Sequence, residues 1–207
     1  MSEVFGLYLV MTDPAAGYDR CAEAAVRAGV RYLQLRMKGA PAEAVAAVAR
    51  RVRAVTQGTA TRFILNDDPD LAAACNADGV HLGQEDEPLV SARRRVPSLR
   101  LWGLSTHNER QAADAVALAP DYIGVGPVFS TPTKARADPV VGLDRLAAIV
   151  AATPLTAVAI GGIDAANLRD VRRAGAMNFA VVRAVCRDPN PFDAIRRLQD
   201  IWFGVTR

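Results

Sequence analysis

Residues 62–86, RFILNDDPDLAAACNADGVHLGQED, contain one complete strand–helix–strand unit and indicate the fold of the whole chain. The short apolar run Arg62–Asn66 has the length of a buried strand, and Pro69–Asn76 has a helical pattern with Asp68 at its N-cap. A second apolar run, Gly79–Leu82, follows a break of small residues that is typical of a helix end. This stretch therefore predicts two parallel strands joined by a crossover helix.

The same alternation runs through the whole chain. The expected strands are Gly6–Met11, Arg31–Arg36, Arg62–Asn66, Gly79–Leu82, Arg100–Ser105, Tyr122–Val125, Thr156–Ile160 and Phe179–Val182. The expected helices are Tyr18–Ala28, Ala42–Thr56, Pro69–Asn76, Pro88–Val96, Glu109–Leu118, Leu143–Ala152, Ala165–Ala174 and Phe192–Trp202. Eight strand–helix units in 207 residues match the lower size limit of a (β/α)8 or TIM barrel.

The α/β alternation leaves one alternative, a doubly wound open sheet. That fold usually carries a glycine-rich dinucleotide turn after its first strand, where this chain has Thr12-Asp13-Pro14. We therefore expect a single TIM-barrel domain over residues 1–207, without a polar linker that would divide it. A barrel of this kind gathers its functional groups at the carboxyl ends of its strands.

Composition excludes several classes of protein. The net charge is +3, which by itself would allow a nucleic-acid partner. The basic runs fall late in predicted helices, where arginine complements the helix dipole: Arg93-Arg94-Arg95, Arg172-Arg173 and Arg196-Arg197. We therefore expect no nucleic-acid partner. No apolar run approaches the length of a membrane span, and the first residues do not resemble a signal peptide; we expect a cytoplasmic protein. The 3 cysteines are widely spaced and are expected to be buried thiols.

Acidic residues follow two neighbouring strands. Asp67 comes after Arg62–Asn66 and Asp86 after Gly79–Leu82, so both carboxylates are expected at the same barrel end. Mg²⁺ takes one or two carboxylates together with substrate phosphate and water, and these two aspartates are the predicted metal ligands. Asp68, which precedes the helical proline, is instead expected to cap the helix.

Basic residues follow the second strand. Alternation places the side chains of Gln34, Arg36 and Lys38 on one side, and those of Leu35 and Met37 in the layer between barrel and helices. Three donors at one strand end suit a diphosphate, because Arg supplies a planar fork and Lys a compact charge. An ordinary charged strand end is the alternative.

Three further segments lie after later strands. The loop from Gly124 to Lys134 contains threonines on both sides of a proline, and Gly161-Gly162 and Val182-Arg183 follow the seventh and eighth strands, where many barrels bind phosphate. Ser105-Thr106-His107 follows the fifth strand; sequence neighbours rarely form a Ser-His catalytic pair, so Ser105 is expected to contact a ligand. We expect His81 to be a packed, hydrogen-bonded histidine rather than a base.

Taken together, these segments resemble the thiamine phosphate synthase family from end to end. The matching residues are Tyr8-Leu9-Val10 with Thr12-Asp13, Gln34-Leu35-Arg36 with Lys38, Asn66-Asp67-Asp68, Asp78 to Asp86, Ser105-Thr106-His107, Gly124 to Lys134, and Ala159 to Ile163. The resemblance implies a transferase that joins hydroxymethylpyrimidine diphosphate to thiazole phosphate, releasing pyrophosphate and forming thiamine phosphate with Mg²⁺. It implies small-molecule substrates. The sequence leaves the number of subunits open, with a homodimer as one alternative.

The resemblance also assigns roles to individual residues. It implies that the catalytic residues are Arg36, Lys38, Ser105 and Lys134. The same four residues, together with Gln34, Asn66, Leu35 and Met37, are implied to form the binding site of the pyrimidine diphosphate. Asp67 and Asp86 would bind Mg²⁺. The thiazole phosphate would contact Thr131, Pro132, Thr133, Gly162, Val182 and Arg183.

The chain departs from the family pattern at Arg183, where many members have serine, and at Met37, where an acidic residue is common. Two rival functions follow from these considerations. A related thiazole tautomerase shares the fold without transferring a diphosphate, and a non-catalytic sensor would bind thiamine intermediates only. The diphosphate-binding residues Arg36, Lys38, Asp67, Asp86 and Lys134 favour the synthase.

Overall fold

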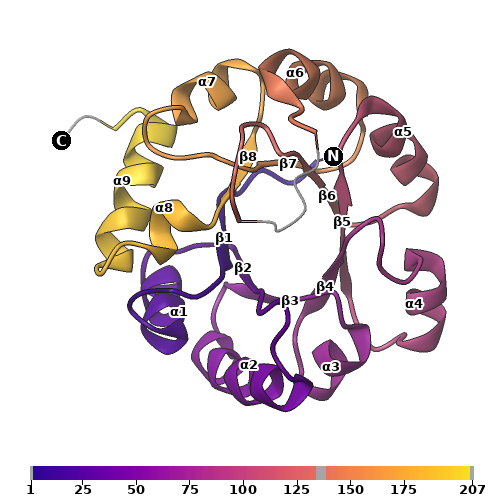
Figure 1. Cartoon of the computed structure of the whole chain (residues 1–207), viewed down its shortest axis with the longest axis vertical. Helices are drawn as coiled ribbons and strands as arrows, with labels where there is room; N and C mark the ends of the chain where they lie inside the picture. The colour runs from indigo at the N-terminus through magenta and orange to yellow at the C-terminus, as the bar shows by residue number, and fades with distance from the viewer. Residues whose placement is uncertain (1, 134–138, 206–207) are drawn as a thin grey trace.

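A closed barrel of eight parallel strands, surrounded by helices, forms the molecule (Figure 1). The computed structural model describes residues 2–133 and 139–205. The strands pair in chain order and β1 closes on β8: β1 Gly6–Met11, β2 Tyr32–Leu35, β3 Arg62–Asn66, β4 Gly79–Leu82, β5 Leu101–Thr106, β6 Tyr122–Val125, β7 Ala157–Ile160 and β8 Asn178–Val181. The predicted (β/α)8 fold is confirmed.

The helices lie outside the ring of strands (Figure 1). Their bounds are α1 Tyr18–Arg27, α2 Ala42–Thr56, α3 Pro69–Ala74, α4 Leu89–Arg95, α5 Glu109–Leu118, α6 Gly142–Ala152, α7 Leu168–Arg173, α8 Arg183–Cys186 and α9 Pro191–Phe203. The short helix α8 was not predicted, because four residues are too few to show a helical period. It begins directly after β8 and carries Arg183, which the sequence placed only after a strand.

Strand alternation divides the apolar residues into two layers. Leu33, Leu35 and Phe63 pack outward against the helices in the larger cluster. A smaller cluster fills the barrel interior and consists of Tyr8, Val10, Tyr32, Ile64, Tyr122, Val158 and Ala180. Three of these seven residues are tyrosines, so the interior contains hydroxyl groups that need hydrogen-bond partners.

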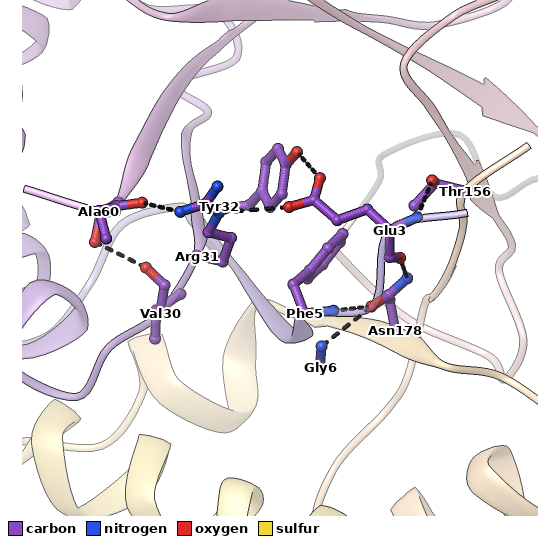
Figure 2. A network of polar contacts seen from close by, with 10 residues as sticks. Glu3, Phe5, Gly6, Val30, Arg31, Tyr32, Ala60, Thr156 and Asn178 are labelled. Atoms are coloured by element: carbon purple, nitrogen blue, oxygen red, sulfur yellow. Dashed lines mark hydrogen bonds and ion pairs between the residues drawn. The ribbon is translucent and has the colours of Figure 1, made fainter. Parts of the chain in front are cut away.

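Residues 3–6 close the amino-terminal end of the barrel (Figure 2). Asn178 at the start of β8 accepts from the backbone N–H groups of Phe5 at 2.7 Å and Gly6 at 3.1 Å, and its amide donates to the Glu3 carbonyl at 2.9 Å. The Glu3 carboxylate accepts from the Tyr32 hydroxyl at 2.7 Å, and Arg31 lies 3.4 Å from it. This end is therefore held by a connected set of satisfied polar groups.

The cysteine prediction is confirmed, because Cys21, Cys75 and Cys186 are buried and free. The arginines of α4 and α7 lie in the last turns of these helices, as predicted. The prediction for Arg196 and Arg197 was wrong: they lie in the middle of α9, which runs on to Phe203, and they pair with Asp200 and Asp188 respectively. Among the described residues, no helix is long and apolar enough to cross a bilayer.

Candidate active site

A cavity of about 450 Å³ opens at the carboxyl ends of the strands. The predicted site residues that line it are Gln34, Arg36, Asn66, Ser105, Thr131, Thr133, Gly162, Val182 and Arg183. Side chains from β2, β3, β5, the β6–α6 segment and the β7 and β8 ends thus converge on one space. Such convergence is the arrangement that a barrel offers for binding small molecules.

The end of β2 presents its alternate side chains to this cavity. Gln34 is only 4% exposed, and its amide donates to the Tyr8 hydroxyl at 2.9 Å. Arg36 lines the cavity; burial lowers the pKa of its guanidinium, while the charges of Asp67 and Asp13 oppose that shift. An arginine has a pKa so high that it stays charged here, and it is therefore a cation facing the cavity.

The neighbours of Gln34 and Arg36 point elsewhere. Leu35 and Met37 pack against the outer core, as alternation predicted, so their side chains do not line the cavity. Lys38 is also not a lining residue, and its ammonium group forms an ion pair with Asp67. Lys38 is therefore placed beside the predicted metal ligands.

Asp67 and Asp86 lie side by side. The Asp86 carboxyl group lies close enough to that of Asp67 to raise its pKa, although neither residue lines the cavity itself. Asp67 has the left-handed φ of 67°, its N–H donates to the His81 carbonyl at 2.8 Å, and Asp86 accepts from the Gly83 N–H at 2.6 Å. Burial, above all, raises the pKa of Asp67, and the neighbouring Asp86 adds to that rise while Lys38 opposes it.

Asp67 and Asp86 are the described residues that could hold a divalent cation at this end of the barrel. Among the described residues, no group of three or more His, Cys, Asp or Glu side chains is arranged to hold a metal. Two adjacent carboxylates that repel each other nevertheless suit a hard divalent cation, which takes its remaining oxygens from phosphate and water. Asp68 has a different role, because it caps α3 by accepting from the Leu71 N–H at 2.9 Å, as predicted.

A continuous chain of hydrogen bonds crosses the barrel interior beneath the cavity. Gln34 contacts Tyr8, the Tyr8 and Tyr122 hydroxyls lie 2.8 Å apart, and Tyr122 lies 3.1 Å from Nδ1 of His81. Nε2 of His81 lies 2.9 Å from Oγ of Ser105. All five residues line the cavity. Burial raises the pKa of both tyrosines, so both keep their protons.

Sequence reasoning did not identify Tyr8 and Tyr122 as site residues. They occupy alternate inward positions of β1 and β6, which looked like ordinary core positions. The histidine prediction is confirmed in part, since His81 is hydrogen-bonded and partly buried. Ser105 pairs with this histidine rather than with its sequence neighbour His107, whose Nδ1 donates to the Gly126 carbonyl at 2.6 Å.

The segment after β6 supplies the hydroxyl groups of Ser130, Thr131 and Thr133 to the cavity. Thr131 and Thr133 line the cavity, and their Oγ1 atoms lie 3.1 Å apart. Pro132, between them, is exposed and is not a lining residue. Lys134 lies outside the residues that the structure describes.

The ends of β7 and β8 form the opposite side of the cavity. Gly162 has a φ of 68°, and a Cβ atom there would lie 2.7 Å from Cβ of Phe129, so only glycine lets these two loops approach so closely. Arg183 lines the cavity from the start of α8, and Arg187, which sequence reasoning missed, lines it from just past the end of the same helix. The spacing of four residues between the two arginines was the available signal.

A comparison with known proteins identifies the family. The family model described as thiamine monophosphate synthase matches residues 7–185. The chain belongs to this family. The predicted family is confirmed, and with it the transferase class.

Individual relatives agree with this assignment. A thiamine-phosphate synthase of Gloeobacter violaceus is 48% identical over 185 residues, which are 89% of this chain but 54% of that protein. A putative thiamine-phosphate synthase of Geobacter sulfurreducens is 42% identical, with 94% of this chain and 92% of the relative covered. The solved structure of a thiamine phosphate pyrophosphorylase from Pyrococcus furiosus superposes with a TM-score of 0.85 at 31% identity and covers 98% of both chains.

Proposed function

We propose that this protein is a thiamine phosphate synthase that joins hydroxymethylpyrimidine diphosphate to thiazole phosphate and releases pyrophosphate. The observation that carries the proposal is a cavity with two cationic sides. Arg36 of the β2 end lies on one side, near the Lys38 and Asp67 pair, and Arg183 with Arg187 lies on the other. Two separate phosphate-bearing substrates require two such positions.

The β2–β5 side is suited to the diphosphate. Arg36, Lys38 and Asn66 would bind its oxygens, and Ser105 would face the same substrate. We further propose that Asp67 and Asp86 hold Mg²⁺, which when bound supplies positive charge to the diphosphate oxygens. With that cation present, Lys38 becomes available to the substrate instead of compensating Asp67.

The β6–β8 side is suited to the thiazole phosphate. The Thr131 and Thr133 hydroxyls would contact this substrate, and Gly162, which lines the cavity, would offer its backbone N–H to the phosphate. Arg183 and Arg187 would supply the opposing charge, and Val182 precedes them at the end of β8. Two arginines on this side can replace the contact that serine makes in many family members.

The proposed reaction is a dissociative displacement. The C–O bond to the diphosphate breaks first, the electron-rich aminopyrimidine carries the resulting methylene cation, and the thiazole nitrogen then donates its electron pair to form the new C–N bond. Arg36 and Lys38 stabilise the negative charge that develops on the departing diphosphate, and each well-placed donor contributes about 3 kcal/mol. No protein nucleophile is needed.

Mass-spectrometric detection of thiamine phosphate from the two purified substrates tests the proposal, with Mg²⁺ present and then removed by chelation. We expect product only with the metal. Binding of Mg²⁺ and diphosphate measured by calorimetry gives a second readout that is independent of turnover. A folded protein that forms no product would instead favour the tautomerase or the sensor. A cytoplasmic location and a homodimer stay predictions.

A further inference from the structure

The donor and the acceptor of each hydrogen bond in the chain beneath the cavity can be assigned, because each member of the chain has a limited number of protons to donate. Gln34 donates one amide proton to the Tyr8 oxygen at 2.9 Å. The Tyr8 proton then has the Tyr122 oxygen, 2.8 Å away, as its acceptor. If Tyr122 donated to Tyr8 instead, the Tyr8 hydroxyl would receive two protons and leave its own without an acceptor in this chain.

The direction continues through His81. The Tyr122 proton is left to donate to Nδ1 of His81, 3.1 Å away, so this nitrogen must be the unprotonated one. His81 then carries its proton on Nε2 and donates it to Oγ of Ser105 at 2.9 Å. Ser105 accepts that proton, and its own hydroxyl proton is directed towards the cavity that it lines.

We propose that Tyr8, Tyr122 and His81 form a one-directional relay that fixes His81 as the Nε2–H tautomer and makes the Ser105 hydroxyl a hydrogen-bond donor to the departing diphosphate. The choice of acceptor rests on the proposed function, whereas the direction of the relay does not. A diphosphate oxygen gains negative charge as the C–O bond breaks, so a donor strengthens its contact in the transition state. The reverse direction would present a lone pair to that oxygen.

The packing holds the relay in place. Tyr8 and Tyr122 are 2% and 1% exposed, and their rings meet edge to face at 5.6 Å. His81 stacks on the Tyr122 ring at 5.5 Å. A Cβ atom at Gly103 would lie 2.2 Å from this tyrosine ring and 2.5 Å from Nδ1 of His81, so glycine opens the space in which the two side chains meet.

The relay also reaches the predicted metal ligands. The backbone carbonyl of His81 accepts from the Asp67 N–H at 2.8 Å. The Gln84 side chain donates to the Ser105 carbonyl at 2.6 Å and holds the end of β5. Tyr8, Tyr122 and His81 are thus positioning residues, and Ser105 is the residue that would touch substrate on the diphosphate side.

Nitrogen-15 NMR of the full chain without a polyhistidine tag tests the direction. The chain contains 2 histidines, and His107 provides an internal reference because its Nδ1 donates to a carbonyl. We expect one histidine of each tautomer, with His107→Asn identifying the signals by loss of the Nδ1–H set. A neutral His81 protonated on Nδ1 would overturn the proposal, whether or not the protein has synthase activity.

A reversal variant makes the test sharper. Gln34→Glu replaces the donating amide by a carboxylate that only accepts, so Tyr8 should donate to it and the whole relay should reverse. At pH 8 we expect the His81 proton to move to Nδ1. An unchanged tautomer in this variant would show that Gln34 does not set the direction.

The functional consequence is tested with Tyr122→Phe. We expect a shift of the His81 Nδ1 signal and a fall in kcat of about tenfold with little change in the pyrimidine diphosphate KM, since the affected contact strengthens in the transition state. Tyr32→Phe is the matched control, because Tyr32 belongs to the same interior cluster but its hydroxyl bonds Glu3. Equal kcat values in both variants would contradict the relay.

Discussion

The two ends of the barrel contain the same kinds of polar residue in opposite arrangements. At the amino-terminal end, Asn178, Glu3 and Tyr32 satisfy one another and the backbone (Figure 2). At the carboxyl end, Asp67 has a left-handed backbone, and the neighbouring like-charged Asp86 raises its pKa. The first arrangement stabilises the fold, whereas the second holds two groups that repel each other, as we expect of a ligand site. We therefore expect substitutions at the amino-terminal end to lower the free energy of unfolding, and substitutions at the carboxyl end to lower turnover.

The largest effect is expected for Asp67→Asn combined with Asp86→Asn. Mg²⁺-dependent turnover should fall about a thousandfold, because the metal and its charge on the diphosphate are lost. Asparagine tolerates the left-handed backbone at position 67, and loss of the like-charge contact should leave the metal-free protein at least as stable. Steady-state kinetics and thermal unfolding of the same samples measure both effects.

Asp78→Asn is the matched change at the other end. Asp78 accepts from the Phe63 N–H at 2.8 Å and pairs with Arg53 at 3.0 Å. The Asp78→Asn substitution should lower the free energy of unfolding by about 2 kcal/mol and leave turnover per folded molecule unchanged. Full turnover in the double aspartate variant would contradict the metal assignment.

Asn178→Ala should cause the next largest effect, a loss of about 3 kcal/mol in the free energy of unfolding. The side chain bonds Phe5, Gly6, Glu3 and Ala157, and its removal leaves several buried backbone groups without partners. Urea titration measures this loss. Asn66→Ala, at the cavity, should change stability little and raise the pyrimidine diphosphate KM; the same stability loss in both variants would remove the distinction between the ends.

Arg183→Ala should raise the thiazole phosphate KM about tenfold with kcat little changed, because the side chain is proposed to bind substrate rather than the leaving group. Arg173→Ala removes an equal charge from an exposed pair with Asp170 in α7 and should leave that KM unchanged. Initial rates at varied thiazole phosphate test both. An unchanged KM in Arg183→Ala would assign the phosphate contact to Arg187 or to the backbone.

The last prediction concerns the interior tyrosines at alkaline pH. Burial raises the pKa of Tyr8, Tyr32 and Tyr122 above the ordinary value of 10.0, so the unfolded chain loses these protons at lower pH than the folded protein does. Stability is therefore fully present below pH 10.0 and falls as the pH rises from there towards the raised folded values. Each such tyrosine contributes a slope of about 1.4 kcal/mol per pH unit.

Tyr32→Phe should remove the contribution of one tyrosine from the pH dependence of the free energy of unfolding. Tyr8 and Tyr122 should account for the slope that remains. Urea unfolding between pH 8 and pH 11 measures it. If the variant and the unchanged protein lost stability with the same slope, Tyr32 would ionise equally in both states.

Much of the site followed from local pattern. Side chains alternate along a strand, which predicts that Gln34 points into the barrel and Leu35 towards the helices. The position of Asp68 before Pro69 predicts that it caps the helix. The side-by-side placement of Asp67 and Asp86 follows from parallel strands ending at one edge. In each case the pattern involves residues on one element or on adjacent ones.

The missed features depend on contacts between different strands or on the placement of a helix. Tyr8, Tyr122 and His81 lie on β1, β6 and β4, and no sequence period connects them. Ser105 was considered with His107 because the two are sequence neighbours, whereas the pleat turns Ser105 towards His81 on the adjacent strand. Arg187 lines the cavity only because α8 follows β8 so closely.

The sequence by itself determined the barrel, the order of its strands and the charged groups at their carboxyl ends, because hydrophobic period and capping act over a few residues. Tertiary structure decided which hydroxyl meets which nitrogen inside the barrel and which arginines share the cavity. The Tyr8–Tyr122 pairing arises from barrel closure, which brings together two residues separated by 114 positions in the chain. The other pairings depend on how neighbouring strands and the helix after β8 are placed.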